Sequence, residues 1–511
     1  MTQPQPIDRS HNPFPQDGVT RGADGVLHYD GLPTSLVAQL RRFAEQTPDV
    51  EAVVEIGGER LAYGQLWDRA SRVAGGLRAA GVGRGDRVAV RYPAGVDWVL
   101  AFWGTLLAGG VVVAPNIRSA APEMRFVLDD ADVTVDLAPG GPLPDGEPYV
   151  EEGLGLTDPA AMFYTSGTTG HPKGVPTSHE AFLTNAENMV RTTGIPRHAG
   201  AELRTLISVP LFHVTGCNSQ LLTALHVGGT SVIMPVLDQT GLLQALVTER
   251  INFLVTVPAV YALILRRPEF ASTDVSGVSW VGYGGAAIAP SLVAALQKAF
   301  PNGRVFNGYG MTETASLITV LPHDDAVEHA DSVGYAVPSI DVAVDPTGDD
   351  PNTGELLVRG GNVMTGYWNR PEATTSTLVD GWLHTGDVVR IDDDGRIHII
   401  DRLKDIINRG GENVSSLEVE AALASAPGVL EAAVVAVSDE VMGEKVGAIL
   451  FGGEGAPIDV DAVLAHLRAN LADFKLPQYI RVVNGPLPRN AGGKLLKGPL
   501  RRDTEWGDPV R

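Results

Sequence analysis

The sequence is poor in cysteine, since its 511 residues include a single one, Cys217. One thiol cannot form an internal disulfide or supply the several sulfur ligands of a cysteine-rich zinc site. We therefore expect a protein of a reducing, cytoplasmic compartment. Cys217 stands in an apolar stretch, and we expect a buried, inert thiol there, because a nucleophilic thiol needs a cationic or helix-terminal neighbour.

Basic residues are also scarce, with 39 Lys and Arg against 61 Asp and Glu and a formal net charge of −22. This charge argues against nucleic acid or an anionic membrane as the main partner, so an anionic ligand must meet a locally positive pocket. The run from Lys475 to Arg502 is an exception, because it holds seven basic residues and no acidic one. It is a candidate anion-facing surface, and a solvated basic tail is the alternative.

An unbroken membrane-spanning run is missing as well. The stretch from Trp98 to Pro115 carries no charge, but Gly109 and Gly110 interrupt it. A buried helix followed by a buried strand therefore explains it better than a transmembrane helix. The first 17 residues lack the basic segment and apolar core of a signal peptide.

Strand-type and helix-type patterns alternate along most of the chain, which predicts α/β domains with largely parallel strands. At 511 residues and 44% hydrophobic content, two or more domains are expected. Residues 1–33 are expected to be a poorly ordered or surface-lying extension, followed by a helix from Thr34. The expected strands are 52–56, 87–92, 111–114, 205–209, 231–234, 253–257 and 278–283, and the expected helices are 66–80, 96–107, 216–226, 242–249 and 291–300.

Two changes of character divide the C-terminal half. Beyond Gly334, short strands and turns predict a smaller β-rich subdomain, which includes a hairpin turn at 392–395. After Asp401, helices at 418–424 and 460–471 and strands at 432–437 and 446–451 predict a separate domain of about one hundred residues. We therefore expect a large domain at 34–400 and a small α+β domain at 405–511.

The segment from Phe163 to Val175 has the composition of a phosphate-binding loop. It gathers hydroxyl residues and glycines around Lys173, directly after an apolar strand. Glycines let backbone N–H groups approach an anion, and the lysine adds a positive charge. A Walker P-loop cannot be laid over it, because Pro172 precedes the lysine and Gly174 follows it. A flexible linker, the other alternative, needs neither the lysine nor the proline.

A loose dinucleotide-binding pattern occurs at Gly282-Tyr-Gly284-Gly-Ala-Ala287. A dehydrogenase would need an acidic ribose-binding residue about twenty positions on, and 301–310 offers none. We interpret these glycines as a close-packed pocket wall.

Three further motifs follow the phosphate-binding loop in order: Asn307-Gly-Tyr-Gly-Met-Thr-Glu-Thr314, His384-Thr-Gly-Asp387 and Pro488-Arg-Asn-Ala-Gly-Gly-Lys494. Together the four resemble the signature motifs of the adenylate-forming superfamily, which contains acyl-CoA synthetases, luciferases and peptide-synthetase adenylation domains. The chain is most similar to stand-alone bacterial acyl-CoA ligases of the fatty-acid type. The resemblance implies two doubly wound α/β subdomains plus the β-rich subdomain within the large domain.

The resemblance implies ATP, Mg²⁺ and CoA as ligands and gives Lys173, Thr312, Glu313 and Lys494 catalytic roles. Glu313 would hold magnesium, Thr312 would donate to the α-phosphate, and Lys494 would reach the reacting carboxylate. Tyr309 would stack on adenine, and Asp387 would accept the ribose hydroxyls. The implied nucleotide-binding residues are Thr165, Ser166, Gly167, Thr168, Thr169, Gly170, Lys173, Gly285, Ala286, Asn307, Gly308, Tyr309, Gly310, Met311, Thr312, Asp387, Ile399 and Arg402.

The resemblance also makes the small domain mobile, with residues 401–404 as a hinge that pivots at Lys404. In one pose Lys494 would serve adenylation, and in the other Gly411 would serve thioester formation. The implied CoA-binding residues are Arg409, Gly410, Gly411, Phe474 and Lys475.

The implied acyl pocket is apolar, which favours a hydrophobic acid over an α-amino acid. It consists of His213, Val214, Tyr283, Gly284 and Met311. His213 resembles an acyl-tunnel gate, and a satisfied core histidine is the alternative. Two departures from the family pattern, Tyr335 and Ser416, could alter domain docking.

The acceptor is expected to be free CoA, because the Gly-Gly-Glu-Asn413 form is typical of CoA ligases. The alternatives are transfer to a carrier protein and catalysis of one half-reaction alone. From other classes, a luciferase-like oxygenase and a non-catalytic nucleotide-binding protein share these motifs. A homodimer is possible.

Overall fold

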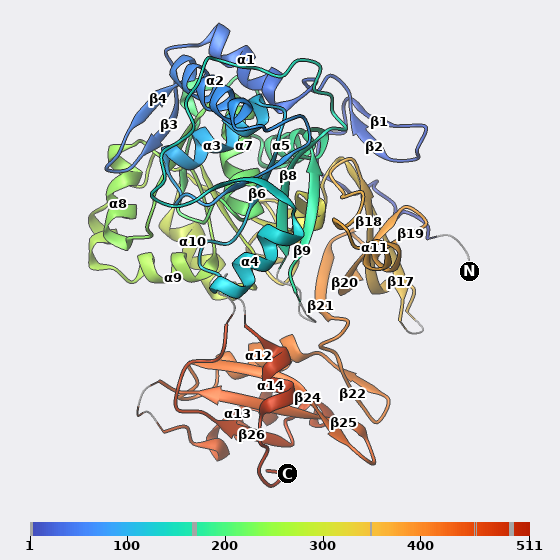
Figure 1. Ribbon diagram of the computed structural model, residues 1–511. Helices are drawn as coiled ribbons and strands as arrows, with labels where there is room; N and C mark the ends of the chain where they lie inside the picture. The colour runs from blue at the N-terminus through green and yellow to red at the C-terminus, as the bar shows by residue number, and fades with distance from the viewer. Residues whose placement is uncertain (1–3, 166–170, 348–349, 454, 456, 490–494) are drawn as a thin grey trace.

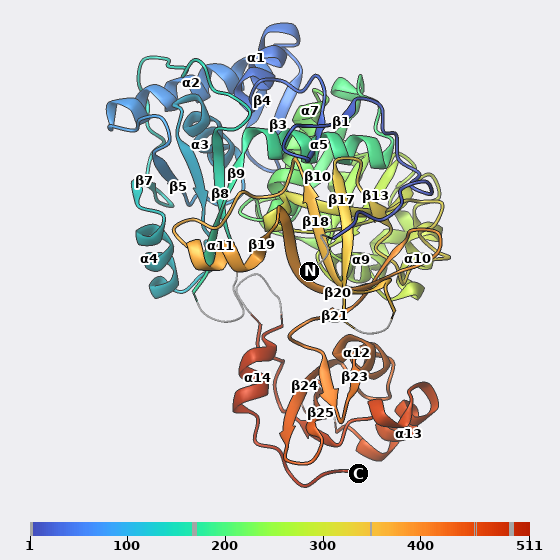
Figure 2. The same ribbon diagram turned by 90° about the vertical axis from the view of Figure 1, so that its right-hand side faces the viewer.

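The chain folds into a large N-terminal part and a smaller C-terminal part, as a computed structural model shows (Figures 1 and 2). The structure describes all residues except 1–3, 166–170, 348–349, 454, 456 and 490–494. Its hydrophobic clusters divide in the same way, because none of them joins described residues before 400 with described residues after 406.

The largest sheet has nine strands among the described residues and runs in the order β16-β15-β14-β13-β12-β10-β11-β3-β4. Its central pairs are parallel and its outer pairs are antiparallel. The strands are β3 (Glu51–Glu55), β4 (Arg60–Ala62), β10 (Arg204–Ile207), β11 (Thr230–Ile233), β12 (Phe253–Thr256), β13 (Trp280–Gly284), β14 (Arg304–Met311), β15 (Ser316–Leu321) and β16 (Tyr335–Ala336). Helices α8 (Gln239–Thr248), α9 (Pro258–Leu265) and α10 (Pro290–Ala299) pack against one face.

A second sheet has the order β7-β5-β6-β8-β9, with parallel pairs and one antiparallel pair, β8 with β9. Its strands are β5 (Arg87–Val90), β6 (Val111–Ala114), β7 (Val133–Leu137), β8 (Pro159–Thr165) and β9 (Lys173–Ser178), and α4 (Ala121–Asp130) precedes β7. The two sheets confirm the predicted α/β alternation.

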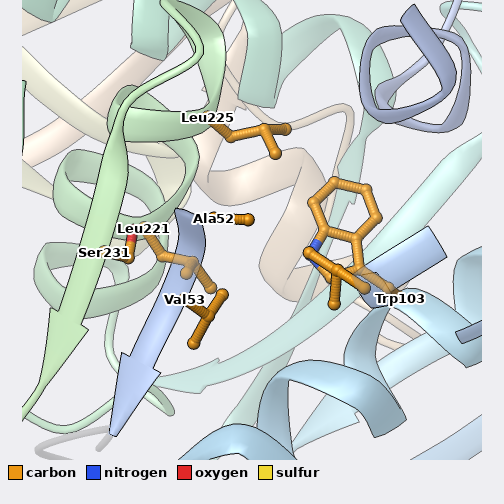
Figure 3. A pocket seen from close by; sticks show the side chains of 7 residues that line it. Ala52, Val53, Trp103, Leu221, Leu225 and Ser231 are labelled. Carbon is orange, nitrogen blue, oxygen red and sulfur yellow. The ribbon is translucent and has the colours of Figure 1, made fainter. Parts of the chain in front are cut away.

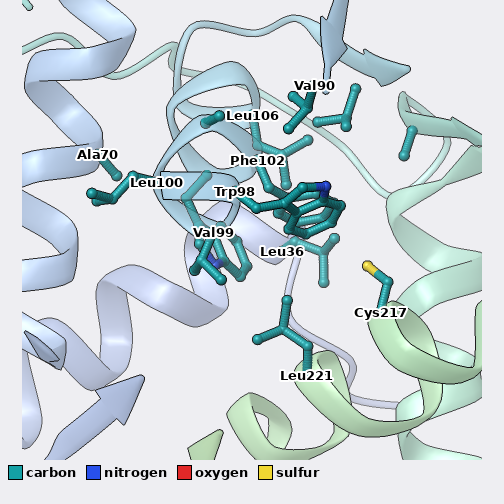
Figure 4. Packing of buried hydrophobic residues seen from close by; sticks show 14 of the residues in the cluster. Leu36, Ala70, Val90, Trp98, Val99, Leu100, Phe102, Leu106, Cys217 and Leu221 are labelled. Carbon is teal, nitrogen blue, oxygen red and sulfur yellow. The ribbon is translucent and has the colours of Figure 1, made fainter. Parts of the chain in front are cut away.

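One large hydrophobic cluster joins these two sheets through helices (Figure 4). The helices are α1 (Leu36–Gln46), α2 (Tyr63–Ala79), α3 (Val96–Leu107), α5 (His179–Thr193), the π-helix Cys217–Leu221 and α7 (Leu222–His226). Every residue of α3 except Asp97 is buried, and β6 follows directly, as predicted for the uncharged stretch. Cys217 is fully buried in this cluster, which raises the pKa of its thiol. No helix in the described ranges is both long and apolar enough for a membrane span.

The predicted β-rich subdomain is an antiparallel sheet of β17 (Ile340–Pro346), β18 (Thr353–Gly360), β19 (Leu378–Val379), β20 (Trp382–Ile391) and β21 (Ile397–Arg402). The short helix α11 (Pro371–Thr377) precedes β19. The Asp392 N–H donates to the Arg396 carbonyl at 3.0 Å, which closes the predicted hairpin turn.

The N-terminal segment has a more definite place than the sequence indicates. It forms the hairpin of β1 (Val19–Arg21) and β2 (Leu27–Tyr29), and both ends of β2 are buried. The Ile7 N–H donates to the Val342 carbonyl at 2.9 Å, and Arg21 pairs with Asp341 at 2.6 Å. The sequence could not predict these attachments, because their partners lie more than 300 residues away. The abundance of Pro and Gly indicated a poorly ordered segment instead.

The C-terminal part is an α+β unit, in agreement with the elements predicted for it. Its sheet has the order β23-β22-β25-β24, and β26 pairs with β25. The elements are β22 (Ile407–Arg409), β23 (Glu412–Val414), α12 (Ser416–Ala424), β24 (Glu431–Asp439), β25 (Gly443–Phe451), α13 (Val460–Asn470), β26 (Tyr479–Val482) and α14 (Lys497–Asp503).

The carboxylate of Asp341 gives a test of how firmly the N-terminal segment is attached. Burial alone would raise the pKa of Asp341, but hydrogen bonds from Arg21 and Arg359 outweigh this and lower it. We expect Asp341→Asn to reduce the free energy of unfolding by about 2 kcal/mol at neutral pH, because a neutral amide cannot offset the two guanidinium charges. Denaturant titration measures the difference.

Because the pKa of Asp341 is lowered by folding, its contribution is present above the unfolded value. It is lost as the pH falls through about 4 and below, so the wild type and the variant should converge there. Asp345→Asn, at an exposed position of the same strand, is the control and should change little. An equal loss in both variants would contradict this account.

Candidate active site

A cation lies over the ring of one tyrosine, and a carboxylate accepts a hydrogen bond from the hydroxyl of the same side chain. The Tyr367 hydroxyl donates to Glu313 Oε1 at 2.9 Å, and Lys173 Nζ lies 3.9 Å from the centroid of the Tyr367 ring. Glu313 and Tyr367 are buried. The structure therefore brings two predicted catalytic residues together, and Tyr367 joins them.

Glu313 lies in a 3₁₀ turn, Thr312–Thr314, between β14 and β15. The two strands approach so closely at Gly310 that a Cβ atom there would lie 1.4 Å from the Ser316 carbonyl oxygen. Only glycine fits this position, which explains one glycine of the Asn307–Thr314 motif in steric terms.

Backbone groups of this turn are held by amides from two other parts of the chain. Asn362 Nδ2 donates to the Thr314 carbonyl at 2.8 Å, and Asn218 Nδ2 donates to the Ala315 carbonyl at 2.7 Å. The Met364 N–H donates to the Glu313 carbonyl at 2.8 Å. The turn that presents Glu313 is thus fixed before any ligand binds.

A second group of predicted residues meets at Asp387, which is buried on β20. The Tyr309 hydroxyl donates to Asp387 Oδ2, and Arg402 Nε lies 2.6 Å from Asp387 Oδ1. Burial, followed by the charge of Asp387, raises the pKa of Tyr309, so its hydroxyl stays protonated and can donate. Three predicted nucleotide-binding residues from three strands therefore form one cluster.

Glu355 holds the backbone next to Asp387. Its Oε1 accepts from the Gly386 N–H at 2.9 Å, and its Oε2 lies 2.8 Å from His384 Nδ1. Gly386 has φ +71, in the left-handed region that favours glycine. Asp345 also approaches this group, so that ligand atoms of Asp345, Glu355 and His384 lie within 4.8 Å of one another. Both oxygens of Glu355 are already engaged, and we assign no ion to this group.

Several of the remaining predicted nucleotide-binding residues belong to the described part of the large domain. Thr165 pairs with Lys173 across β8 and β9, and Ile399 on β21 packs against the same hydrophobic cluster as Tyr309 and Met311. Gly285 and Ala286 are exposed, and Asn307 and Gly308 are half-buried on β14. Ser166, Gly167, Thr168, Thr169, Gly170 and Lys494 lie outside the described residues.

Three of the five predicted acyl-pocket residues pack against different hydrophobic clusters, and the shared pocket of the five stays a prediction. Val214 packs against the cluster that joins the two sheets, whereas Met311 packs against the cluster of the β-rich subdomain. Tyr283 is buried among α8, α9 and α10, and its hydroxyl has no partner among the described residues. At Gly284 a Cβ atom would lie 2.4 Å from the Gly308 carbonyl oxygen.

His213 stands at the start of a short helix and has its ring 4.8 Å from that of Phe212. Burial, with a smaller contribution from the charge of Arg118, lowers the pKa of His213 to about 4. The ring is therefore neutral at physiological pH. The described residues give it no hydrogen-bond partner, which a satisfied core histidine would have.

The small cavity drawn in Figure 3 is too small for an acyl group. Its volume is about 10 Å³, room for at most one water molecule. It lies in the core between β3, α3 and the helices after Cys217 (Figure 3), and neither Glu313 nor Asp387 lines it. Its lining residues are Ala52, Val53, Leu66, Trp103, Leu221, Leu225 and Ser231.

The predicted CoA-binding residues lie in the C-terminal part. Gly410 and Gly411 form the turn between β22 and β23, with φ +62 and +93. Arg409 ends β22, and its Nε is buried without a partner among the described residues. Phe474 packs on the domain core, and Arg501 donates to the carbonyl of Lys404, the predicted pivot.

The basic run from Lys475 to Arg502 is less of an anion-facing surface than its sequence indicates. Acidic residues from elsewhere in the small domain pair with at least four of its seven basic residues. The pairs are Lys475 with Glu418, Arg489 with Glu431, Lys497 with Glu420 and Arg501 with Asp405. Lys475, predicted to bind CoA, is held by both Glu418 oxygens at 2.6 and 2.7 Å.

Sequence reasoning missed Tyr367 and Glu355. Tyr367 stands in a Gly-Tyr-Trp-Asn369 segment, and Glu355 in Gly-Glu-Leu356 at the start of β18. An isolated tyrosine or glutamate is common on protein surfaces, and the partners lie 54 and 31 residues away. Spacing along the chain therefore gave no signal for either.

The donor set at Glu313 suits a magnesium ion. The hydrogen bond that the described residues give this carboxylate goes to Oε1, and Oε2 can meet a hard cation. Lys173 adds a positive charge beside it, and Asp387 offers an acceptor for hydroxyl groups. The arrangement can bind a phosphorylated ligand that also carries vicinal hydroxyls.

Comparison with known proteins covers almost the whole chain. The family model described as AMP-binding enzyme matches residues 40–152 and 140–368, and the one described as AMP-binding enzyme C-terminal domain matches residues 418–494. A feruloyl-CoA synthase from an Amycolatopsis species is 37% identical over 487 residues, which cover 90% of this chain and 97% of the relative. The long-chain-fatty-acid–CoA ligase FadD13 of Mycobacterium tuberculosis is 35% identical over 500 residues, with coverage of 90% and 97%.

Solved structures agree with these relatives. The o-succinylbenzoate CoA synthetase MenE of Bacillus subtilis, in complex with the acyl-adenylate intermediate OSB-AMP, superposes with a TM-score of 0.81 at 28% identity and covers 92% of this chain and 99% of its own. The same enzyme in complex with ATP and magnesium gives a TM-score of 0.80 at 28% identity, with coverage of 91% and 98%. The chain therefore belongs to the AMP-binding enzyme family, the adenylate-forming superfamily of acyl-CoA ligases that its motifs resemble.

Proposed function

We propose that this chain is an AMP-forming ligase that joins a hydrophobic carboxylic acid to CoA. In the first step a carboxylate oxygen bonds to the α-phosphorus of ATP and pyrophosphate leaves, which gives an acyl-adenylate. In the second step the CoA thiol, having lost its proton, bonds to the acyl carbon and AMP leaves. The observation that supports this most strongly is the contact of both Lys173 and Glu313 with Tyr367.

The first step brings a carboxylate up to a triphosphate, and the two anions repel each other strongly in a site shielded from water. Lys173 offsets this charge, since its ammonium has no carboxylate partner in the described part of the chain. Magnesium held by Glu313 would supply further positive charge to the phosphate oxygens. Thr312, next to Glu313 in the same turn, would donate to the α-phosphate.

The nucleoside would be held by the Asp387 cluster. Asp387 would accept from both ribose hydroxyls, and Arg402, paired with it at 2.6 Å, orients this carboxylate. Tyr309, already bonded to Asp387, would lie against adenine. Gly285 and Ala286, which are exposed, would form the edge of the base site.

The C-terminal part would serve the two steps in turn. Lys494 would reach the reacting carboxylate during adenylation, and the hairpin of Arg409, Gly410 and Gly411 would accommodate the pantetheine arm. A rotation of the small domain about Lys404 would replace Lys494 at the site by the hairpin. The glycine turn supports this, because no atom of the described residues other than its chain neighbours lies within 4 Å of the place where a Cβ of Gly411 would be.

A hydrophobic acid fits the residues near His213. His213 is uncharged and lies among Phe212 and Val214, so this region offers no ionic partner for an ammonium group. The names of the two relatives, feruloyl-CoA synthase and long-chain-fatty-acid–CoA ligase, support acids with a large apolar part. A carrier protein remains the alternative acceptor.

The proposal predicts acid-dependent exchange of labelled pyrophosphate into ATP. We expect exchange with at least one aromatic or fatty acid and none with α-amino acids. Mass detection should then find the acyl-CoA when CoA is added. Exchange without any thioester would contradict CoA as the acceptor, and a panel of purified carrier proteins would test the alternative. No exchange with any acid would contradict the proposed adenylation.

Lys494 allows the two half-reactions to be separated. We expect Lys494→Ala to reduce adenylation by about three orders of magnitude, because it removes a positive charge next to the developing transition-state charge. Conversion of a supplied acyl-adenylate to acyl-CoA should stay near the wild-type rate. An equal loss in both assays would contradict the division of labour between Lys494 and Gly411.

Glu355 tests the Asp387 cluster without touching the nucleotide. We expect Glu355→Ala to raise the KM for ATP about tenfold, since the Gly386 N–H loses its acceptor and Asp387 loses its fixed position. The preference for ATP over 2′-deoxy-ATP should fall as well. Asp345→Asn, at the exposed position opposite Glu355, is the matched control. Equal losses with both nucleotides would show that Glu355 acts on stability alone.

A further inference from the structure

Tyr367 is anchored to the strand that carries Lys173. The Trp368 N–H donates to the Gly174 carbonyl at 2.9 Å, and Trp368 Nε1 donates to the Asp130 carbonyl at 3.0 Å. The Tyr367 N–H donates to Thr374 Oγ1 at 2.9 Å. The ring is therefore placed by hydrogen bonds on both sides, independently of its contacts with Lys173 and Glu313.

The ring face and the hydroxyl of Tyr367 contact opposite charges. The aromatic face carries negative charge density and attracts the Lys173 ammonium, whereas the hydroxyl donates to the Glu313 carboxylate. A tyrosine hydroxyl is protonated at neutral pH, so it is a donor to the Glu313 carboxylate.

A direct ion pair between Lys173 and Glu313 would weaken the site. In a buried setting such a pair is strong, and each ligand would have to break it before binding. Phosphate would compete with Glu313 for the ammonium, and a metal ion would compete with Lys173 for the carboxylate. Contacts with a neutral ring and a neutral hydroxyl are weaker than this pair and easier to exchange.

We propose that Tyr367 is a positioning residue that keeps Lys173 and Glu313 apart, so that each charge stays available to its own ligand. This inference rests on the proposed function, in which Lys173 meets phosphate and Glu313 meets magnesium. It assigns Tyr367 no contact with the reacting atoms. Its effect is on the binding of free ATP and on how much magnesium strengthens that binding.

The test is calorimetric titration of the full chain with ATP, once in EDTA and once in excess Mg²⁺. EDTA removes magnesium. The affinity for ATP in this arm therefore reports on whether the Lys173 ammonium is available to the phosphates. We expect Tyr367→Leu to weaken ATP binding in EDTA about tenfold, because Lys173 can then pair with Glu313. Removing Glu313 as well, in Tyr367→Leu/Glu313→Gln, should restore binding in EDTA to within about threefold of Glu313→Gln alone.

Restored ATP binding in the double variant would distinguish a role in keeping the two charges apart from a purely structural role. A residue that only supports the fold would leave the double variant as weak as Tyr367→Leu, or weaker, and this result would overturn the inference. Unchanged binding of ATP to Tyr367→Leu would overturn it too. Failure of the wild type to bind ATP would instead contradict the proposed function itself.

Tyr367→Phe keeps the inference testable if the leucine variant does not fold. The ring remains, so the affinity for ATP in EDTA should stay within about twofold of the wild type. The factor by which Mg²⁺ strengthens ATP binding should change about threefold or more. The inference would be contradicted if the affinity for ATP in EDTA changed as much as the factor by which Mg²⁺ strengthens binding. Tyr164→Phe is the matched control, since it also removes a tyrosine hydroxyl that donates to a carboxylate, here Asp130 Oδ2 at 2.8 Å. It should bind ATP like the wild type in both arms.

Discussion

The contact of Tyr367 with both Lys173 and Glu313 is the interaction on which the active site depends. The protein carries a net charge of −22 and must nevertheless bind a triphosphate next to a carboxylate. At least four of the seven basic residues between Lys475 and Arg502 form ion pairs with acidic residues. Few positive charges in the described part of the chain are therefore left to bind phosphate. Lys173 is one of them, because it contacts the neutral ring of Tyr367.

The site is built where the β-rich subdomain meets the two α/β sheets. Met364, Asn362 and Tyr367 reach the turn of Glu313 from the segment that follows β18, and Tyr309 reaches Asp387 from the large sheet. Each half of the site is thus completed by a residue from another subdomain. This explains why the three subdomains share clusters of buried side chains, whereas the C-terminal part has its own.

Local patterns predicted most of the fold. The uncharged stretch at α3 and β6, the parallel strands and the hairpin at Asp392 follow from hydrophobic periodicity and turn residues, which depend on neighbours along the chain. The motifs likewise identified Lys173, Glu313, Tyr309 and Asp387 as site residues, and the structure brings them together in two adjacent groups.

Long-range partners could not be predicted in this way. Tyr367 and Glu355 act through residues 31 to 194 positions away, and nothing in their own segments distinguishes them from ordinary side chains. The N-terminal hairpin and the ion pairs of the basic run were concealed for the same reason. Val214, Tyr283 and Met311, expected around the acyl group, pack against three different clusters, because they come from a helix and from two different strands.

The central claim is that a carboxylate oxygen attacks the α-phosphorus of ATP. It is tested most directly by running the complete reaction with an acid in which both carboxylate oxygens are ¹⁸O, followed by mass analysis of AMP and the thioester. The account predicts one ¹⁸O atom in AMP and one in the thioester carbonyl, because the oxygen that bonded to phosphorus leaves with AMP. Unlabelled AMP, with the ¹⁸O found in pyrophosphate or phosphate instead, would contradict it.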